Sequence, residues 1–251
     1  MNDDVDGLEV NVIPFLSEEP LTPFTPFWKY FILECKLTDI DINSLRDFLL
    51  SKEPEIMSIK DVPIDDAGTG VGHDSTTGRW LYYNIFDWDH PEIRKLQKNI
   101  KELYHDYYKN IVNTMAIPNT NIRGWMNILE KGQHINKHLH GCGNTSFLSG
   151  NFMISCEDTM TVYVNPYEVA SMKQLLNRID QGESFESGNL YPSINVPGML
   201  TLFPNYVPHF TSVHEGDSPR ISLAFELTPF ENRDDYINDT IGANAKEMVS
   251  L

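Results

Sequence analysis

The second half of this chain consists of short apolar runs separated by turn residues, and no other feature of the sequence constrains the fold as strongly. From residue 121 onward the runs are RGWMNIL, SFLSGNFMIS, MTVYV, GMLTLFP and RISLAFEL. Short runs rich in β-branched and aromatic side chains, with Gly, Asn and Pro between them, are typical of antiparallel strands. We therefore expect a β barrel or sandwich over residues 121–228.

The first 120 residues predict strands and helices that support this β structure. Residues 27–35 and 79–86 are rich in aromatic and β-branched side chains, which favour strands. Asp41 is suited to cap a helix that follows it, and Pro91 is suited to the first turn of a longer helix. In the longer helix, apolar side chains recur every three or four positions from Ile93 to Ile111. One face of that helix should therefore pack on a sheet.

The length of the chain and its charge narrow the class of protein. With 251 residues, 41% of them hydrophobic, the chain can bury one sizeable core, so we expect a single domain over 1–251 with a polar tail at 229–251. The 19 Lys and Arg against 36 Asp and Glu give a formal net charge of −17, which would repel nucleic acid and anionic membranes. An acidic start and the lack of long apolar runs predict a soluble, cytoplasmic protein.

Histidines and one arginine in the β half form the candidate chemistry. His138 and His140 are two residues apart, so on a strand they would point to the same face and could bind one metal ion through neutral imidazole nitrogens. Such a pair alone is a weak indication, because most are ordinary hydrogen-bonded or surface histidines. A third histidine, His209, precedes Arg220, which begins an apolar strand. If Arg220 points inward it requires an anion, and a carboxylate matches its forked guanidinium group.

These residues, in this order, resemble the Fe(II)- and 2-oxoglutarate-dependent oxygenases, and more narrowly the microbial and phage members related to prolyl 4-hydroxylases. The resemblance extends over residues 121–228 and is specific only when its motifs are taken together. The motifs are W-x-N-x-L-x-x-G at 125–132, His-x-His at 138 and 140, L-S-G at 148–150, P-G-x-L-x-L-F-P at 197–204, His209, and R-I-S at 220–222.

The resemblance implies a mainly β (α+β) fold, the double-stranded β-helix or jelly roll, with supporting N-terminal helices. It implies Fe(II) bound by His138 and His209, and 2-oxoglutarate with its distal carboxylate held by Arg220 and Ser222. Asn127 would add a hydrogen bond to this cosubstrate. The implied protein is a dioxygenase, a hydroxylase that couples 2-oxoglutarate decarboxylation to C–H oxidation and uses dioxygen. Its substrate would be a small molecule or a peptide, with prolyl hydroxylation suggested by kinship.

One position departs from the usual pattern of that family. Two residues after the first histidine most members have Asp or Glu, but this chain has His140, and no acidic residue occurs from 131 to 156. We expect a site of three histidines, His138, His140 and His209. Two other sites stay open: two histidines with water, as in the aspartyl/asparaginyl β-hydroxylases, or a site completed by a distant acid, Glu157 or Asp158.

Two polar segments and several single residues near the motifs also have expected roles. Two polar segments, residues 58–78 and 165–196, are the expected substrate lids, and the acidic surface favours basic or neutral substrates. We expect His134 to be solvated, His214 to lie at the surface, Cys142 to be inert, and Trp125, Tyr163 and Tyr206 to be core or pocket wall without a catalytic role.

Two other functions remain compatible with these residues. A cupin-like enzyme with three histidines, such as a thiol dioxygenase or an isomerase, would use the same metal site without 2-oxoglutarate, but it would not explain the R-I-S motif at 220–222. A non-catalytic module would keep the fold and use the pocket to bind a carboxylate. It would not need iron.

Overall fold

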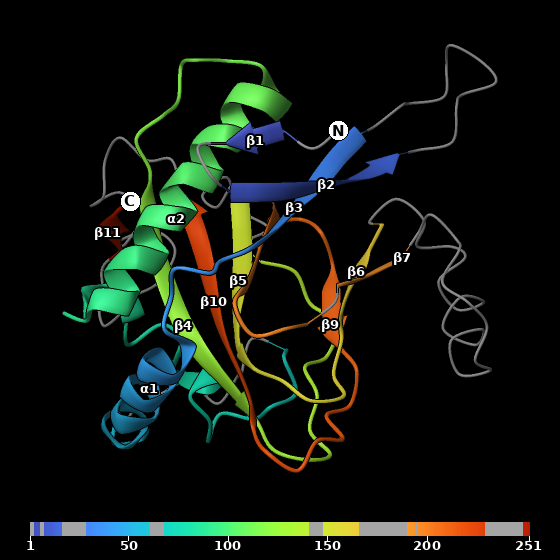
Figure 1. Cartoon of the computed structure of the whole chain (residues 1–251). Coiled ribbons are helices and arrows are strands. Elements are labelled where there is room, and N and C mark those ends of the chain that lie inside the picture. Colours follow the sequence, from blue (N-terminus) through green and yellow to red (C-terminus); the bar gives the residue numbers. More distant parts are fainter. Residues whose placement is uncertain are drawn as a thin grey trace.

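The framework is a large antiparallel sheet, seen in a computed structural model that describes residues 3–5, 8–16, 29–60, 68–140, 148–165, 190–193, 195–228 and 248–251. The sheet has eight strands (Figure 1). Their order across the sheet is β1 (Asp3–Val5), β2 (Leu8–Leu16), β3 (Lys29–Lys36), β8 (Met199–Pro204), β5 (Leu148–Ser155), β10 (Arg220–Thr228), β4 (Asn121–Leu129) and β11 (Val249–Ser250).

A smaller sheet lies against the large one and encloses the pocket described below. Its three strands are β7 (Leu190–Ser193), β6 (Thr161–Val164) and β9 (His209–Thr211), in that order. In Figure 1 it lies on the side of the large sheet away from the helices. The expected β structure of residues 121–228 is therefore present, as two facing antiparallel sheets.

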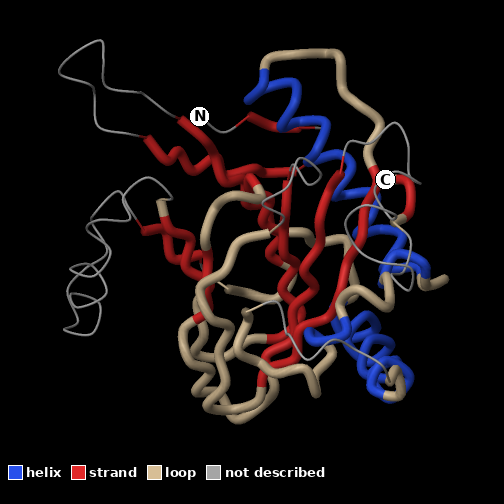
Figure 2. The backbone as a smooth tube through the Cα atoms, turned by 180° about the vertical axis from the view of Figure 1, so that it is seen from behind, coloured by secondary structure: helices blue, strands red, loops and turns tan. Residues whose placement is uncertain are grey.

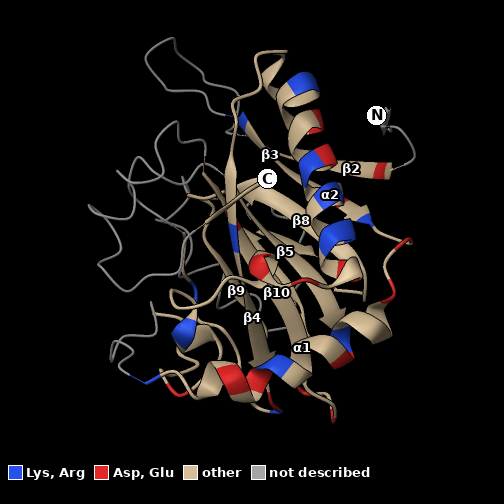
Figure 3. Ribbon diagram, turned by 90° about the vertical axis from the view of Figure 1, so that its left-hand side faces the viewer, with Lys and Arg blue, Asp and Glu red and all other residues tan. Residues whose placement is uncertain are grey.

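Two helices cover the other face of the large sheet, as the sequence predicts (Figure 2). They are α1 (Ile42–Met57) and α2 (Pro91–Asp106), the second continued by a π-helical turn, η3 (Tyr107–Val112). The Asp41 side chain accepts a hydrogen bond from the Ser44 backbone N–H at 3.0 Å, so the predicted cap is confirmed. The charged residues lie largely along these helices and in loops, as Figure 3 shows, which leaves the sheet face under the helices apolar.

The alternation of side chains along β10 divides its two faces. Ile221, Leu223, Phe225 and Leu227 pack in the core under the helices. The residues between them point to the opposite face, because successive side chains of a strand alternate. These are Arg220, Ser222, Ala224 and Glu226, which all line one pocket.

The predicted strand at residues 79–86 is wrong. This segment runs from a short 3-10 turn, η1 (Thr77–Arg79), to a second one, η2 (Ile85–Asp87). Its side chains, rather than its backbone, take up the hydrogen bonds at the open edge of β4: Gly124 N–H donates to Asn84 Oδ1 at 3.0 Å, and Met126 N–H donates to the Tyr83 hydroxyl at 2.8 Å. Aromatic content alone could not distinguish this packing from strand pairing.

Parts of three predicted segments fall outside the described residues. They are the first lid at 61–67, the second lid over most of 166–194, and the tail at 229–247; Cys142 also lies outside. The described end of the tail is not loose, because residues 249–250 pair with β4. Among the helices of the described residues, none has the length and apolar character needed to cross a membrane.

Candidate metal centre and its pocket

A pocket opens between the two sheets, on the face of the large sheet opposite the helices. Its volume is about 160 Å³. A cavity of about 150 Å³ can hold a benzene-sized molecule, so this pocket has room for one small ligand. Its wall comes from β4, β10, β6, β9 and the segments at 69–80 and 135–140. Both sheets therefore contribute to a single site.

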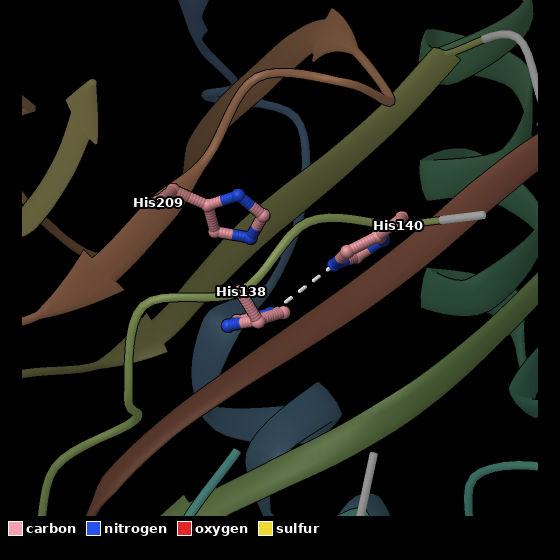
Figure 4. Close-up of side chains that lie close together, drawn as sticks. All are labelled: His138, His140 and His209. Atoms are coloured by element: carbon pink, nitrogen blue, oxygen red, sulfur yellow. Dashed lines mark hydrogen bonds between the residues drawn. The ribbon is translucent and has the colours of Figure 1, made fainter. Parts of the chain in front are cut away.

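Three histidines converge in this pocket (Figure 4). His138 and His140 lie on an extended segment, and His138 forms a backbone bridge with His209 at the start of β9. One ring nitrogen from each histidine lies within 4.8 Å of the others, and the Nε2 atoms of His138 and His140 are 3.3 Å apart. The spacing of an imidazole triad around a single metal ion is of this kind.

The hydrogen bonds of His138 and His209 fix which nitrogen is free to bind a metal. His138 Nδ1 lies 2.8 Å from the Asn136 carbonyl oxygen, and His209 Nδ1 lies 3.0 Å from the Val207 carbonyl oxygen. A carbonyl oxygen only accepts, so each Nδ1 carries the proton and each Nε2 keeps its lone pair. Both Nε2 atoms are therefore available as ligands.

Burial keeps the three imidazoles neutral. It lowers the pKa of His138 and lowers that of His140 well below its ordinary value. The pKa of His209 falls to about 3, first because of burial and then because of the neighbouring His138. A metal binds the neutral form of histidine, so the site is ready to accept one at neutral pH.

Arg220 lines the same pocket, and no described acidic residue is its partner. Its side chain is 2% exposed; Nη1 donates to Ser222 Oγ at 3.0 Å and Nη2 donates to Thr161 Oγ1 at 3.2 Å. Nε has no hydrogen-bond partner among the described residues, and none of their carboxylates pairs with this guanidinium. Burial lowers its pKa to about 10, which still leaves a cation at neutral pH. A buried, uncompensated cation is a strong attractor for an anion.

Asn127 lies beside this cation. Its Oδ1 accepts a hydrogen bond from the Thr77 hydroxyl at 2.8 Å, and Ser222 is opposite it in the pairing of β4 with β10. Because Oδ1 is occupied, the amide N–H groups of Asn127 are the part of this side chain left to contact a ligand in the pocket.

A buried carboxylate lies behind His140. Glu226 Oε1 is 3.6 Å from His140 Nδ1, and Glu226 Oε2 accepts from Arg123 Nη2 at 3.3 Å. The exposed fractions are 0% for Arg123, 4% for Glu226 and 7% for His140. Burial raises the pKa of Glu226, and Arg123 opposes that rise.

Comparison with known proteins shows which family this part of the chain resembles. Residues 123–226, which contain the pocket strands, match the family described as "Putative 2OG-Fe(II) oxygenase". The viral collagen prolyl hydroxylase of Paramecium Bursaria Chlorella virus-1, crystallised as its 2OG complex, aligns with a TM-score of 0.50 at 11% identity, over 79% of this chain and 96% of its own. The resemblance to the Fe(II)/2-oxoglutarate oxygenases is confirmed.

Two further solved structures and one sequence search complete these findings. AviO1 from Streptomyces viridochromogenes Tue57 aligns with a TM-score of 0.52 at 11% identity, over 86% of this chain and 92% of its own. A 2OG-Fe(II) oxygenase family oxidoreductase from Burkholderia pseudomallei aligns at 13% identity and a TM-score of 0.40, over 58% of this chain and 62% of its own. A search of the curated proteins gives no match. The alignments with TM-scores of 0.50 and 0.52 confirm the predicted double-stranded β-helix. At identities this low, a structural match shows the fold alone.

Most of the residues singled out in the sequence meet in this pocket. His138, His140, His209, Arg220, Ser222 and Asn127 all line it. Glu157, one of the two distant acids that were kept open, instead accepts a hydrogen bond from Ser218 at 2.8 Å and does not line the pocket. Trp125 forms part of the pocket wall, Tyr163 is buried, and Tyr206 is exposed.

His214 is a correction, because it does not lie at the surface. Its side chain is wholly buried, with its ring nitrogens 2.7 Å from Thr159 Oγ1 and 2.7 Å from the Ser218 carbonyl oxygen. It therefore ties two turns together. His134 is exposed, as expected.

Sequence reasoning missed two residues that contact the candidate site. Thr161 supports Arg220, and Glu226 supports His140. Glu226 could have been found, because it lies six residues after Arg220 on one strand and therefore on the same face. Thr161 comes from the facing sheet, and nothing in its local sequence indicates that position.

Proposed function

We propose that this protein is an Fe(II)- and 2-oxoglutarate-dependent dioxygenase, a hydroxylase of a peptide or small-molecule substrate. One observation carries the proposal: a buried arginine without an acidic partner in the described chain shares a small pocket with three converging neutral histidines. The histidines suit a divalent metal, and the arginine suits the far carboxylate of a short dicarboxylate.

The residues of the pocket fit both groups. In this proposal His138, His140 and His209 hold Fe(II) through Nε2, while Arg220 and Ser222 hold the distal carboxylate of 2-oxoglutarate and Asn127 donates to it. Three neutral ligands leave the charge of Fe(II) uncompensated, so a dianionic cosubstrate is favoured at this site. Fe(II) with 2-oxoglutarate and dioxygen would supply the oxidising power for attack on a C–H bond.

The remaining pocket residues orient the ligands and exclude water. Thr161 and Ser222 hold the Arg220 fork in place from two strands of different sheets. Trp125 closes the wall beside His140, with ring centroids 5.5 Å apart. Preorganised groups of this kind lower the cost of aligning the cosubstrate with the metal.

The proposed substrate is a peptide or a small molecule that is basic or neutral. Prolyl or other peptidyl hydroxylation is suggested by kinship, and the same fold serves many reactions. A net charge of −17 favours basic or neutral substrates over acidic ones. The lid roles of residues 58–78 and 165–196, the single-domain organisation and the cytoplasmic location stay predictions.

A cupin-like enzyme with three histidines is the second candidate. Among the described residues, the cluster of converging side chains contains three histidines and no acidic residue, which favours this candidate. Such an enzyme would not require a buried arginine facing the metal site. A non-catalytic carboxylate-binding module would explain Arg220 but not the convergence of three imidazoles.

Two variants separate the roles of metal and cosubstrate. His209→Ala should abolish Fe(II) binding, since it removes one of three ligands. Arg220→Ala should keep Fe(II) binding and weaken 2-oxoglutarate binding by about 100-fold, because a charge-assisted pair contributes roughly 3 kcal/mol. Arg220→Lys is the matched control, because it keeps the positive charge but loses the forked guanidinium group. Its affinity for 2-oxoglutarate should lie between those of the wild type and Arg220→Ala.

The measurements are anaerobic equilibrium dialysis with Fe(II) and with labelled 2-oxoglutarate, followed by an assay of succinate release. Full Fe(II) occupancy in His209→Ala would show the metal assignment to be wrong. Unchanged 2-oxoglutarate affinity in Arg220→Ala, with iron bound, would favour the cupin-like alternative.

A further inference from the structure

The Nδ1 atoms of the three histidines differ in their surroundings. For His138 and His209 the acceptor is the carbonyl oxygen two residues earlier in the chain, at 2.8 and 3.0 Å. For His140 no carbonyl plays this part. The nearest acidic atom is Glu226 Oε1, at 3.6 Å from His140 Nδ1.

The contact between Glu226 and His140 is built into the fold. Glu226 stands on the pocket face of β10 directly opposite Arg123 of β4, and Arg123 Nη2 donates to its Oε2 at 3.3 Å. The guanidinium of Arg123 lies over the Trp80 ring, 4.6 Å from its centroid. The carboxylate is therefore held on one side by a wholly buried cation and faces His140 with its other oxygen.

A metal bound through His140 Nε2 would leave the proton of that ring on Nδ1. In the present structure this Nδ1 is buried and has no hydrogen-bond partner among the described residues. A shortening of about 0.5 Å would bring it into hydrogen-bond range of Glu226 Oε1. A carboxylate that accepts from the far nitrogen of a ligating histidine fixes the ring and makes it a better ligand.

We propose that Glu226 is a positioning residue of the metal centre that accepts the Nδ1 proton of His140, fixes the orientation of this ring and makes it a better ligand. This inference rests on the proposed metal site. Glu226 acts through His140 rather than as a ligand, because its carboxylate faces the Nδ1 atom of that ring. The cluster of atoms that could hold the metal contains one nitrogen from each histidine and does not include the Glu226 carboxylate.

The test is Co(II) binding by the metal-free full chain, measured by calorimetry together with the visible spectrum of the bound Co(II). Glu226→Gln should weaken Co(II) affinity by about 10- to 100-fold, the usual loss when such an outer partner is removed. Glu34→Gln is the matched control: Glu34 is also 4% exposed, but it accepts from Tyr191 and Ser193 and does not line the pocket. It should change affinity by less than about twofold.

A double-mutant cycle separates positioning through His140 from a general effect of burial. In a His140→Gln background, where the side-chain amide oxygen can still ligate the metal but the Nδ1 proton is gone, Glu226→Gln should change Co(II) affinity by less than about twofold. If Glu226→Gln unfolds the metal-free chain by stranding the charge of Arg123, the variant Arg123→Met/Glu226→Gln removes both charges and should show the same loss of affinity.

Three results would overturn the inference. They are wild-type Co(II) affinity in Glu226→Gln, an equal loss in both backgrounds of the cycle, and a loss as complete as that of His209→Ala, which would make Glu226 a ligand. Failure of the proposed function has a different signature: the wild-type chain would bind Co(II) but not 2-oxoglutarate, and the cycle would still give its predicted result.

Discussion

At the scale of residues, the site depends on polar side chains that burial has made unusual. The three histidines are kept neutral by burial and by one another. Arg220 stays cationic in the same pocket without an acidic partner in the described chain. Burying an uncompensated cation lowers the stability of the folded chain. The same cation favours the binding of a dianion, and neutral ring nitrogens favour the binding of a metal.

Acidic pH should destabilise the metal-free protein through these histidines. The pKa of His209 is about 3 in the folded chain, against an ordinary value of 6.5. The unfolded chain therefore binds more protons below about pH 6.5, so the free energy of unfolding falls as pH decreases. For His209 alone the slope should approach roughly 1.4 kcal/mol per pH unit between about pH 6 and pH 5.

The measurement is denaturant unfolding at a series of pH values in the presence of a chelator. His209→Gln removes one titrating group and should show a shallower slope than the wild type. Parallel slopes for the two proteins would contradict the assignment of a neutral, buried His209.

The residues of the site were predictable to different degrees for a physical reason. The histidines, Arg220 and Ser222 lie in motifs whose order is visible in the sequence. The ion pair of Arg123 with Glu226 depends on the register of β4 against β10, which no local pattern determines. The burial of His214 likewise depends on two turns, at Thr159 and Ser218, that meet only in the folded chain.

At the scale of elements, a helix with several local sequence signals was predicted correctly, whereas a segment with aromatic content alone was not. The helix from Pro91 has a proline in its first turn and a long apolar stripe, and both agree with the structure. Residues 79–86 have aromatic content, but the segment runs from one 3-10 turn to another and forms no strand. They pack across β4 through side chains, and Gly124 permits this close approach, since a Cβ there would lie 2.6 Å from the Phe86 ring.

Removing the Tyr83 hydroxyl should test this packing. It accepts from the Met126 N–H at 2.8 Å, and both residues are buried, so Tyr83→Phe leaves a donor of β4 unsatisfied. We expect a loss of about 1–3 kcal/mol in the free energy of unfolding. Tyr82→Phe is the control, since no hydrogen bond of the Tyr82 hydroxyl is found in the described chain, and it should stay within about 0.5 kcal/mol of the wild type. An equal effect of both changes would argue against this role of residues 79–86.

At the scale of the whole molecule, the large sheet forms the core with the helices and the small sheet completes the pocket. The large sheet buries one face under α1 and α2, and it presents its other face to the pocket. The small sheet closes that pocket and contributes His209 and Thr161. Because the ligands of the proposed metal and the arginine for the cosubstrate come from both sheets, the site exists only when the sheets are assembled.

The central claim is that the histidines and Arg220 together bind a metal and 2-oxoglutarate in one pocket. Anaerobic titration of the Fe(II)-loaded chain with 2-oxoglutarate tests it most directly, because a 2-oxo acid that chelates Fe(II) gives a weak visible charge-transfer band. In the wild type the band should appear and saturate as 2-oxoglutarate is added. In Arg220→Ala, saturation should require a far higher 2-oxoglutarate concentration. Iron binding with no band at any 2-oxoglutarate concentration would contradict it.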